Sequence, residues 1–304
     1  MRLQARIRAR FLGPCVALTL LAGAAGTLAQ SPAGMNAQKK AAFVSSTKEK
    51  AVSGDVAAQL QLAALFEQGF GVPHDYVQSA FWYRKAADQG NANAQVNLGE
   101  QYEDGRGVQQ SFTEAAFWYR KAAVQGDADG QNNLANLYAN GQGLVRDYVQ
   151  AASWYRKAAD RGSAAAQVQL GSLYDYGQGV PQDYAEAAIW YRKAAEQGDS
   201  GAQYRLGGLY ANGHGFPKNN AEAYFWFDVA AALVKGQDLP AAAERDIIAA
   251  KLSPAELSEA QERAAKWFVE HPAPPCIQVS DQTKTCYRTV QEMESVINSQ
   301  KEKP

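Results

Sequence analysis

Five tryptophans spaced by 36 residues constrain the fold more than any other feature of this 304-residue chain. Trp82 begins the stretch Trp-Tyr-Arg-Lys-Ala-Ala, which returns at Trp118, Trp154 and Trp190 and, in decayed form, at Trp226. A fixed period of this size is typical of solenoids built from stacked supersecondary units. We therefore expect one array of five copies, at 54–89, 90–125, 126–161, 162–197 and 198–233.

Each copy predicts two helices separated by a glycine-rich turn. A glycine and a capping residue open the copy, and a leucine and an aromatic ring four residues apart, such as Leu98 and Tyr102, then share one helix face. A Gly-x-Gly turn ends this first helix with a left-handed position. The second helix begins at a cap such as Ser111 with Glu114 three residues later, so a capping box or a close variant is expected in all five copies.

The composition of these helices predicts an all-α solenoid. Alanine pairs such as Ala122-Ala123 allow neighbouring helices to approach closely, and the Trp-Tyr pair supplies large buried areas. The Arg-Lys pair near the end of each second helix suits the negative pole of the helix dipole and indicates no function. A single hairpin cannot bury its own apolar faces, so the copies must stack.

The pattern resembles the Sel-one-like repeats, which are 36-residue relatives of the tetratricopeptide repeat. The residues that carry the resemblance in one copy are Gln167, Leu170-Gly171, Leu173-Tyr174, Gly177, Gly179-Val180, Asp183, Ala187-Ala188 and Trp190-Tyr191-Arg192-Lys193-Ala194-Ala195. The resemblance covers residues 54 to about 233. It implies an α-solenoid with capping units and a role in holding other proteins, and it does not identify the partner.

Atypical segments flank the array. Residues 1–29 have a basic start, an apolar run and a small residue at Ala29, as a cleaved signal peptide of an exported protein does; an uncleaved membrane anchor is the alternative. Residues 30–53 are interpreted as a linker and an N-terminal capping helix, and residues 234–272 as C-terminal capping helices. We therefore expect a periplasmic or secreted bacterial protein.

The tail, 273–304, contains two cysteines ten residues apart. In an exported protein this favours a disulfide between Cys276 and Cys286. The segments 277–279 and 287–290 are predicted to form a short hairpin that the disulfide closes.

Charge and motifs exclude several functions. Removing 1–29 takes four arginines and leaves 26 Lys and Arg against 31 Asp and Glu, which disfavours nucleic acid as a partner. The turn glycines are not followed by Lys and Ser or Thr, and no histidines are spaced to bind zinc. The sequence therefore predicts no catalytic residue, no metal ligand, no cofactor and no stable membrane insertion after signal cleavage.

One motif keeps an enzymatic alternative open. Ser45-Ser46-Thr47-Lys48 matches the Ser-x-x-Lys nucleophile motif of penicillin-recognising enzymes, and some secreted relatives of the repeat family are described as β-lactamases. Those relatives carry a cysteine pair in most repeats, which this chain lacks, and no Ser-Asp-Asn or Lys-Thr-Gly accompanies the motif. The alternative function is therefore a β-lactamase-like hydrolase that acts on cell-wall material.

A polar stripe on the first helices is the predicted binding surface. In tetratricopeptide-type solenoids the first helices line the concave face, and carboxamides there can pair with the backbone of an extended peptide. Ordinary solvated side chains are the alternative interpretation. The candidate residues are Gln61, Asn97, Asn133, Gln169, Arg205, Glu100, Asn136, Asp104, Asn140 and Tyr176.

Overall fold

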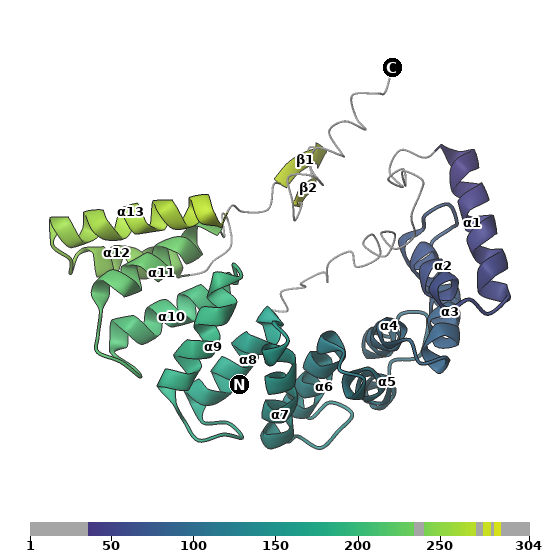
Figure 1. The fold of residues 1–304 in the computed structure, drawn as a ribbon, viewed down its shortest axis with the longest axis horizontal. Coiled ribbons are helices and arrows are strands. Elements are labelled where there is room, and N and C mark those ends of the chain that lie inside the picture. The colour runs from purple at the N-terminus through teal and green to yellow at the C-terminus, as the bar shows by residue number, and fades with distance from the viewer. Residues whose placement is uncertain (1–35, 234–239, 272–275, 281–282, 287–304) are drawn as a thin grey trace, which may run out of the picture.

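The computed structural model describes residues 36–233, 240–271, 276–280 and 283–286. Within them, thirteen helices and a two-stranded hairpin follow one another along the chain. From α1 to α12 each helix packs against the next in sequence order, α13 packs against α11, and the helices trace an arc (Figure 1). The predicted all-α solenoid is confirmed.

The array has two rows of helices, one helix of each row in every repeat. The first helices are α2 (Val56–Gln68), α4 (Ala92–Asp104), α6 (Ala128–Asn140), α8 (Ala164–Tyr176) and α10 (Ser200–Asn212). The second helices are α3 (Tyr76–Asp88), α5 (Phe112–Val124), α7 (Tyr148–Asp160), α9 (Tyr184–Glu196) and α11 (Asn220–Leu233). Three helices flank the array, α1 (Ala37–Val52), α12 (Ala241–Ala249) and α13 (Pro254–Glu270).

The ends of the first helices follow the sequence signals. In α4 the side chain of Asn91 accepts a hydrogen bond from the backbone N–H of Ala94 at 2.8 Å. Gly105 ends the helix with φ +71°, a left-handed conformation that glycine adopts without steric cost. In each of the other four first helices, an aspartate or serine side chain accepts the equivalent hydrogen bond, and a left-handed glycine ends the helix.

The capping-box prediction is only half right for the second helices. Ser111 accepts from the N–H of Glu114 at 3.2 Å, but no second-helix glutamate or glutamine returns a bond to its cap residue. The backbone N–H of Ser111 already donates to the carbonyl of Tyr102 at 2.8 Å, and the other four caps do the same. A complete capping box is present only at Ser253 and Glu256 among the described helices.

The tryptophans connect the repeats. Trp118 of α5 lies in the core cluster of the preceding repeat with Leu62, Trp82 and Ala86. Trp190 lies in the same way in the cluster of the third repeat and Trp226 in that of the fourth, and all three indoles are buried. Each repeat therefore completes the core of the one before it, as a nearest-neighbour solenoid requires.

A row of buried glutamines adds hydrogen bonds that the sequence analysis missed. Gln95 donates through Nε2 to the carbonyl of Ala87 at 3.1 Å, and its Oε1 accepts from Gln125 at 2.8 Å. The first of these bonds recurs in all five repeats, from Gln59, Gln95, Gln131, Gln167 and Gln203. Buried amides are retained when their groups are paired in this way.

The arginine of the Trp-Tyr-Arg-Lys stretch also has a structural role. Arg120 donates to the hydroxyl of Tyr138 in the next repeat at 2.6 Å, and Arg84, Arg156 and Arg192 do the same to their next tyrosines. These bonds join each second helix to the following first helix. The assignment to the helix dipole alone was therefore incomplete.

Both flanking regions continue the packing. At the N-terminus, α1 packs on α2, and Val44 and Ala51 are buried in the first core cluster. At the C-terminus, Trp267 of α13 joins the cluster that contains Trp226. Trp267 thus covers the end of the array as a sixth indole.

The tail hairpin differs from its prediction in register. The strands are β1 (Cys276–Ser280) and β2 (Thr283–Cys286), so the second strand precedes the predicted segment 287–290, which lies outside the described residues. Cys276 and Cys286 are direct partners in the antiparallel ladder. The disulfide remains a prediction, and the predicted signal peptide, 1–29, also lies outside the described residues.

Candidate binding surface

The first helices α2 and α4 can be followed on the inner side of the arc (Figure 1). In Figure 1, α2 and α4 lie toward its interior and α3 and α5 toward its exterior. α4 also contacts α6 directly, without an intervening second helix. Residues on the open sides of the first helices therefore share one surface, which we call the inner face.

The predicted stripe lies on this face and is open to solvent to different degrees. Gln169, Asp104, Asn140 and Tyr176 are exposed, and the other six predicted residues are partly buried. Neither Asn97 nor Gln169 makes a side-chain hydrogen bond with any described residue. These two amides contrast with the buried glutamines two positions earlier, all of which are bonded.

Several stripe residues already have partners within the chain. Gln61 accepts from Thr47 at 3.5 Å, Asn133 accepts from Asn132 at 3.4 Å, and Asn140 donates to Gln142 at 3.3 Å. Asn136 is the most committed, since its Oδ1 accepts from the hydroxyl of Tyr155 at 2.6 Å. Asn136 therefore serves the fold rather than an open contact.

Tyrosine hydroxyls from the second helices reach the edge of the inner face. Tyr83 donates to Glu67 at 2.8 Å, Tyr119 to Glu103 at 2.9 Å and Tyr191 to Asp175 at 3.2 Å. Burial raises the pKa of all three phenols, and the facing carboxylates raise it further. Because Ala139 replaces the acidic residue in the third repeat, Tyr155 turns to Asn136 instead.

Glu100 on α4 is the exception among the partly buried acidic groups of the first helices. It makes no hydrogen bond or ion pair with a described residue, whereas Arg106 pairs with Glu67 at 3.1 Å and with Asp104 at 3.2 Å. Burial raises the pKa of Glu100 to about 7; Arg106 opposes the rise, and Glu67, Asp129 and Glu103 add to it. A cation placed beside a carboxyl in this environment stabilises its ionised form.

Arg205 on α10 is the opposite case. It is the only basic residue in the five first helices, which together carry six acidic ones, Glu67, Glu100, Glu103, Asp104, Asp129 and Asp175. Its guanidinium donates to Tyr176 at 3.4 Å and lies 5.8 Å from the ring centre of Tyr191. No carboxylate of the described residues lies within ion-pair distance of it.

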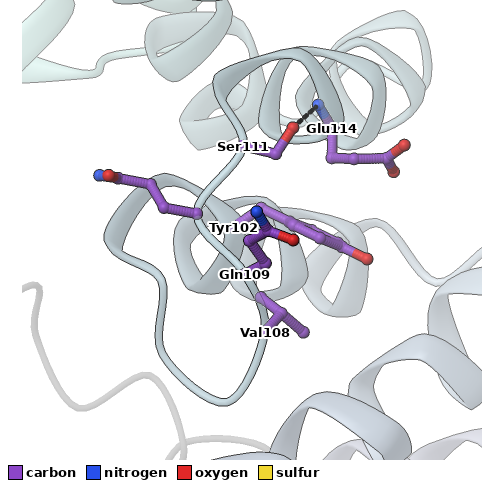
Figure 2. Close-up of a pocket in the computed structure, with 6 residues that line it drawn as sticks. Tyr102, Val108, Gln109, Ser111 and Glu114 are labelled. Carbon is purple, nitrogen blue, oxygen red and sulfur yellow. Dashed lines mark hydrogen bonds between the residues drawn. The ribbon is translucent and has the colours of Figure 1, made fainter.

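The Ser-x-x-Lys residues of the enzymatic alternative lie apart from the two surface pockets of the described residues. A surface pocket at the α4–α5 turn, shown in Figure 2, is lined by Tyr102, Val108, Gln109, Gln110, Ser111 and Glu114, without a nucleophile and base pair. Ser45 and Lys48 are both exposed on α1 and line neither this pocket nor the groove beside α9. The described residues contain no group of three histidine, cysteine or acidic side chains suited to a metal ion.

Comparison with known proteins decides the family. The Sel1 repeat model matches five consecutive segments, residues 56–91, 92–127, 128–163, 164–199 and 200–234. The chain belongs to the Sel1 repeat family. Sel1 repeat proteins generally act in protein–protein interaction and are generally not enzymes.

Solved structures of Sel1 repeat proteins show the same architecture. A Sel1 repeat protein from Oxalobacter formigenes is 32% identical, with a TM-score of 0.63 over 77% of this chain and 98% of that one. The protective antigen c5321 of uropathogenic Escherichia coli, which has the same repeat fold, is 31% identical, with a TM-score of 0.51 over 87% of this chain and 60% of that one. No curated protein sequence matches the chain. Within the described residues, no helix is long and apolar enough to span a bilayer.

Proposed function

We propose that this protein is a non-catalytic scaffold of the bacterial envelope that holds an extended segment of a partner protein on its inner face. The observation that carries the proposal is the contrast between two amide rows of the first helices. The buried row is bonded in every repeat, while Asn97 and Gln169 in the open row have no partner in the described chain. Open carboxamides can both donate to and accept from a peptide backbone, whatever its sequence.

The envelope location rests on the sequence of residues 1–29. Their basic start, apolar run and small residue at Ala29 are those of an export signal. Mass spectrometry of the protein from the periplasm should find Gln30, or a residue close to it, at the N-terminus. Intact Met1 in the soluble fraction would contradict export with cleavage.

Partner binding is tested with an amide variant. Cross-linking and affinity purification from the envelope fraction identify the partner, and calorimetry then measures its affinity. Asn97→Ala, Asn133→Ala and Gln169→Ala together should weaken binding about ten-fold or more, because each lost hydrogen bond contributes about 0.5–1.5 kcal/mol. The fold should survive, since alanine favours helices.

The matched control removes exposed amides from the second helices. Gln78 and Gln150 are exposed on α3 and α7, so the double variant Gln78→Ala and Gln150→Ala should bind as the unchanged protein does. Lysines of the second helices are less suitable as controls, because they cover tryptophan rings. The Nζ atoms of Lys157 and Lys193 lie 3.7 and 3.9 Å from the ring centres of Trp154 and Trp190. Weaker binding in the Gln78 and Gln150 variant alone would place the partner on the outer face.

A further inference from the structure

The inner face carries its partly buried, unpaired charges at two separate places. Five of the six acidic residues of the first helices lie in the first three repeats, and the single base, Arg205, lies in the fifth. Arg106 neutralises Glu67 and Asp104, and tyrosine hydroxyls bind Glu103 and Asp175. Glu100 and Arg205 are left as the partly buried charges without an ion-pair partner among the described residues.

A partly buried charge without a counter-ion costs free energy, because it has lost water and gained no opposite charge. Both groups here are in that condition, with opposite signs, and both stand on the face assigned to the partner. A cation beside Glu100 would therefore lower the free-energy cost of its unpaired charge, and an anion beside Arg205 would do the same there.

We propose that the inner face selects an extended segment that places a lysine or arginine at Glu100 and a carboxylate, from an acidic side chain or a chain end, at Arg205. This inference rests on the proposed function and names the kind of segment that it would bind. The amides of Asn133 and Gln169 lie in the repeats between the two charges and contact the intervening backbone.

The separation of the two charges in the bound segment follows from the repeat geometry. Glu100 and Arg205 lie three repeats apart, and α4 and α6, the first helices of two consecutive repeats, are in direct contact. At roughly 8–10 Å per helix step and about 3.3 Å per extended residue, the two charges of the segment should be about eight residues apart.

Protonation gives a second, independent consequence. The charged groups around Glu100 come from every neighbouring element and are Glu67, Glu103, Arg106, Asp129 and the phenols of Tyr83 and Tyr119. With a pKa of about 7, Glu100 is only partly ionised at neutral pH. A bound cation favours the ionised form, so binding should strengthen from pH 6 to pH 8.

The experiment is a selection from a display library of random 16-residue peptides at about 0.15 M salt, where screening leaves mainly short-range pairs. Parallel selections use the unchanged protein, Glu100→Gln, Arg205→Gln and the control Glu114→Gln with Lys218→Gln, whose charges are exposed elsewhere. Peptides selected by the unchanged protein and by the control should carry a basic residue and a carboxylate about eight positions apart, in a single order. Glu100→Gln should lose the basic preference and Arg205→Gln the acidic one.

An enriched peptide is then synthesised and measured by fluorescence anisotropy. Each single substitution should weaken binding about ten-fold, and the strengthening from pH 6 to pH 8 should vanish in Glu100→Gln. Enriched peptides without this charge pattern would overturn the inference and leave the proposed function standing. Failure to enrich any peptide would overturn both.

Discussion

Residues that depart from the repeat pattern show what single positions contribute. Gln89, Gln125 and Gln197 each donate to the Oε1 of the buried glutamine of their own repeat at 2.8 Å. In the third repeat, Arg161 takes this place, and the Oε1 of Gln131 is buried without a hydrogen bond. One substitution thus accounts for an unsatisfied acceptor in the middle of the array.

Arg161→Gln should stabilise the protein. The new amide restores the missing donor to Gln131, and a hydrogen bond of this kind contributes about 1 kcal/mol. Chemical denaturation measures the change. As a control, Gln197→Ala should destabilise by a similar amount, because it removes the donor to Gln167. A loss of stability in Arg161→Gln would show that the arginine has packing contacts of greater value.

Glu100 makes the stability dependent on pH. Its pKa is raised from 4.5 to about 7 in the folded protein, so the folded state holds the proton more tightly than the unfolded chain. Stability from this group is therefore present at low pH and is lost as pH rises through about 7.

Glu100→Gln, which imitates the protonated carboxyl, should raise the unfolding free energy at pH 8 by about 1 kcal/mol after allowance for partial solvent exposure. At pH 4.5 it should change little. Thermal unfolding at the two pH values tests this, and an equal effect at both would mean that the carboxyl is not protonated near pH 7.

At the scale of the helix, the third repeat is again the exception. Phe81, Phe117 and Phe225 each meet the neighbouring tryptophan edge to face, with ring centres 4.9–5.0 Å apart. Ser153 takes that position in α7, and Trp154 is only partly buried. The identical Trp-Tyr-Arg-Lys motif thus encloses its indole less completely when the preceding residue is small.

Trp118→Ala should therefore cost more than Trp154→Ala. Trp118 is 2% exposed, and truncation of a buried aromatic ring of this size costs about 3–5 kcal/mol. Calorimetry should also show a broadened or split transition, since repeats couple only to their neighbours. Ser153→Phe is the complementary variant and should stabilise by about 0.5–1.5 kcal/mol. Equal costs for the two tryptophans would contradict the role of the shielding ring.

The sequence predicted the helices well because their signals are local. Asparagine and serine caps, terminating glycines and the leucine–aromatic spacing need only a few neighbouring residues to be interpreted. The partner of the Ser111 N–H lies in the preceding helix, however, so the capping box could not be judged from α5 alone. Gln95 and Asn97 are similar amides about 200° apart on one helix, and only packing reveals which one is buried.

The candidate surface was predicted in outline for the same reason. The periodic stripe identified the open side of the first helices, but not which amides were already in use. The bond from Tyr155 to Asn136 depends on Ala139, an alanine whose effect appears only in three dimensions. The isolation of Glu100 likewise depends on the ion pairs that Arg106 makes with Glu67 and Asp104.

At the scale of the whole molecule, the two described strands lie beyond the repeats in the sequence. β1 and β2 pair with each other, and Cys276 faces Cys286 in the ladder. Directly opposite antiparallel residues have Cα atoms about 4.5–5.5 Å apart, which suits a disulfide.

Protein purified from the periplasm should contain no free thiol, because Cys15 lies in the segment that signal cleavage removes. Thiol titration in denaturant without reductant measures this. Reduction should leave the main unfolding transition unchanged, since the hairpin lies outside the repeats. Two titratable thiols in the exported protein would refute the disulfide.

The placement of indoles in the core of the preceding repeat has a consequence for how the number of repeats can change. Trp118, Trp190 and Trp226 each lie in the core of the preceding repeat, and Trp267 joins the cluster that already contains Trp226. A duplication or deletion of 36 codons inside the array leaves the core of each repeat filled and both ends of the array covered. The number of repeats can therefore change by whole repeats without a new type of core. The length of the proposed partner segment can change with it.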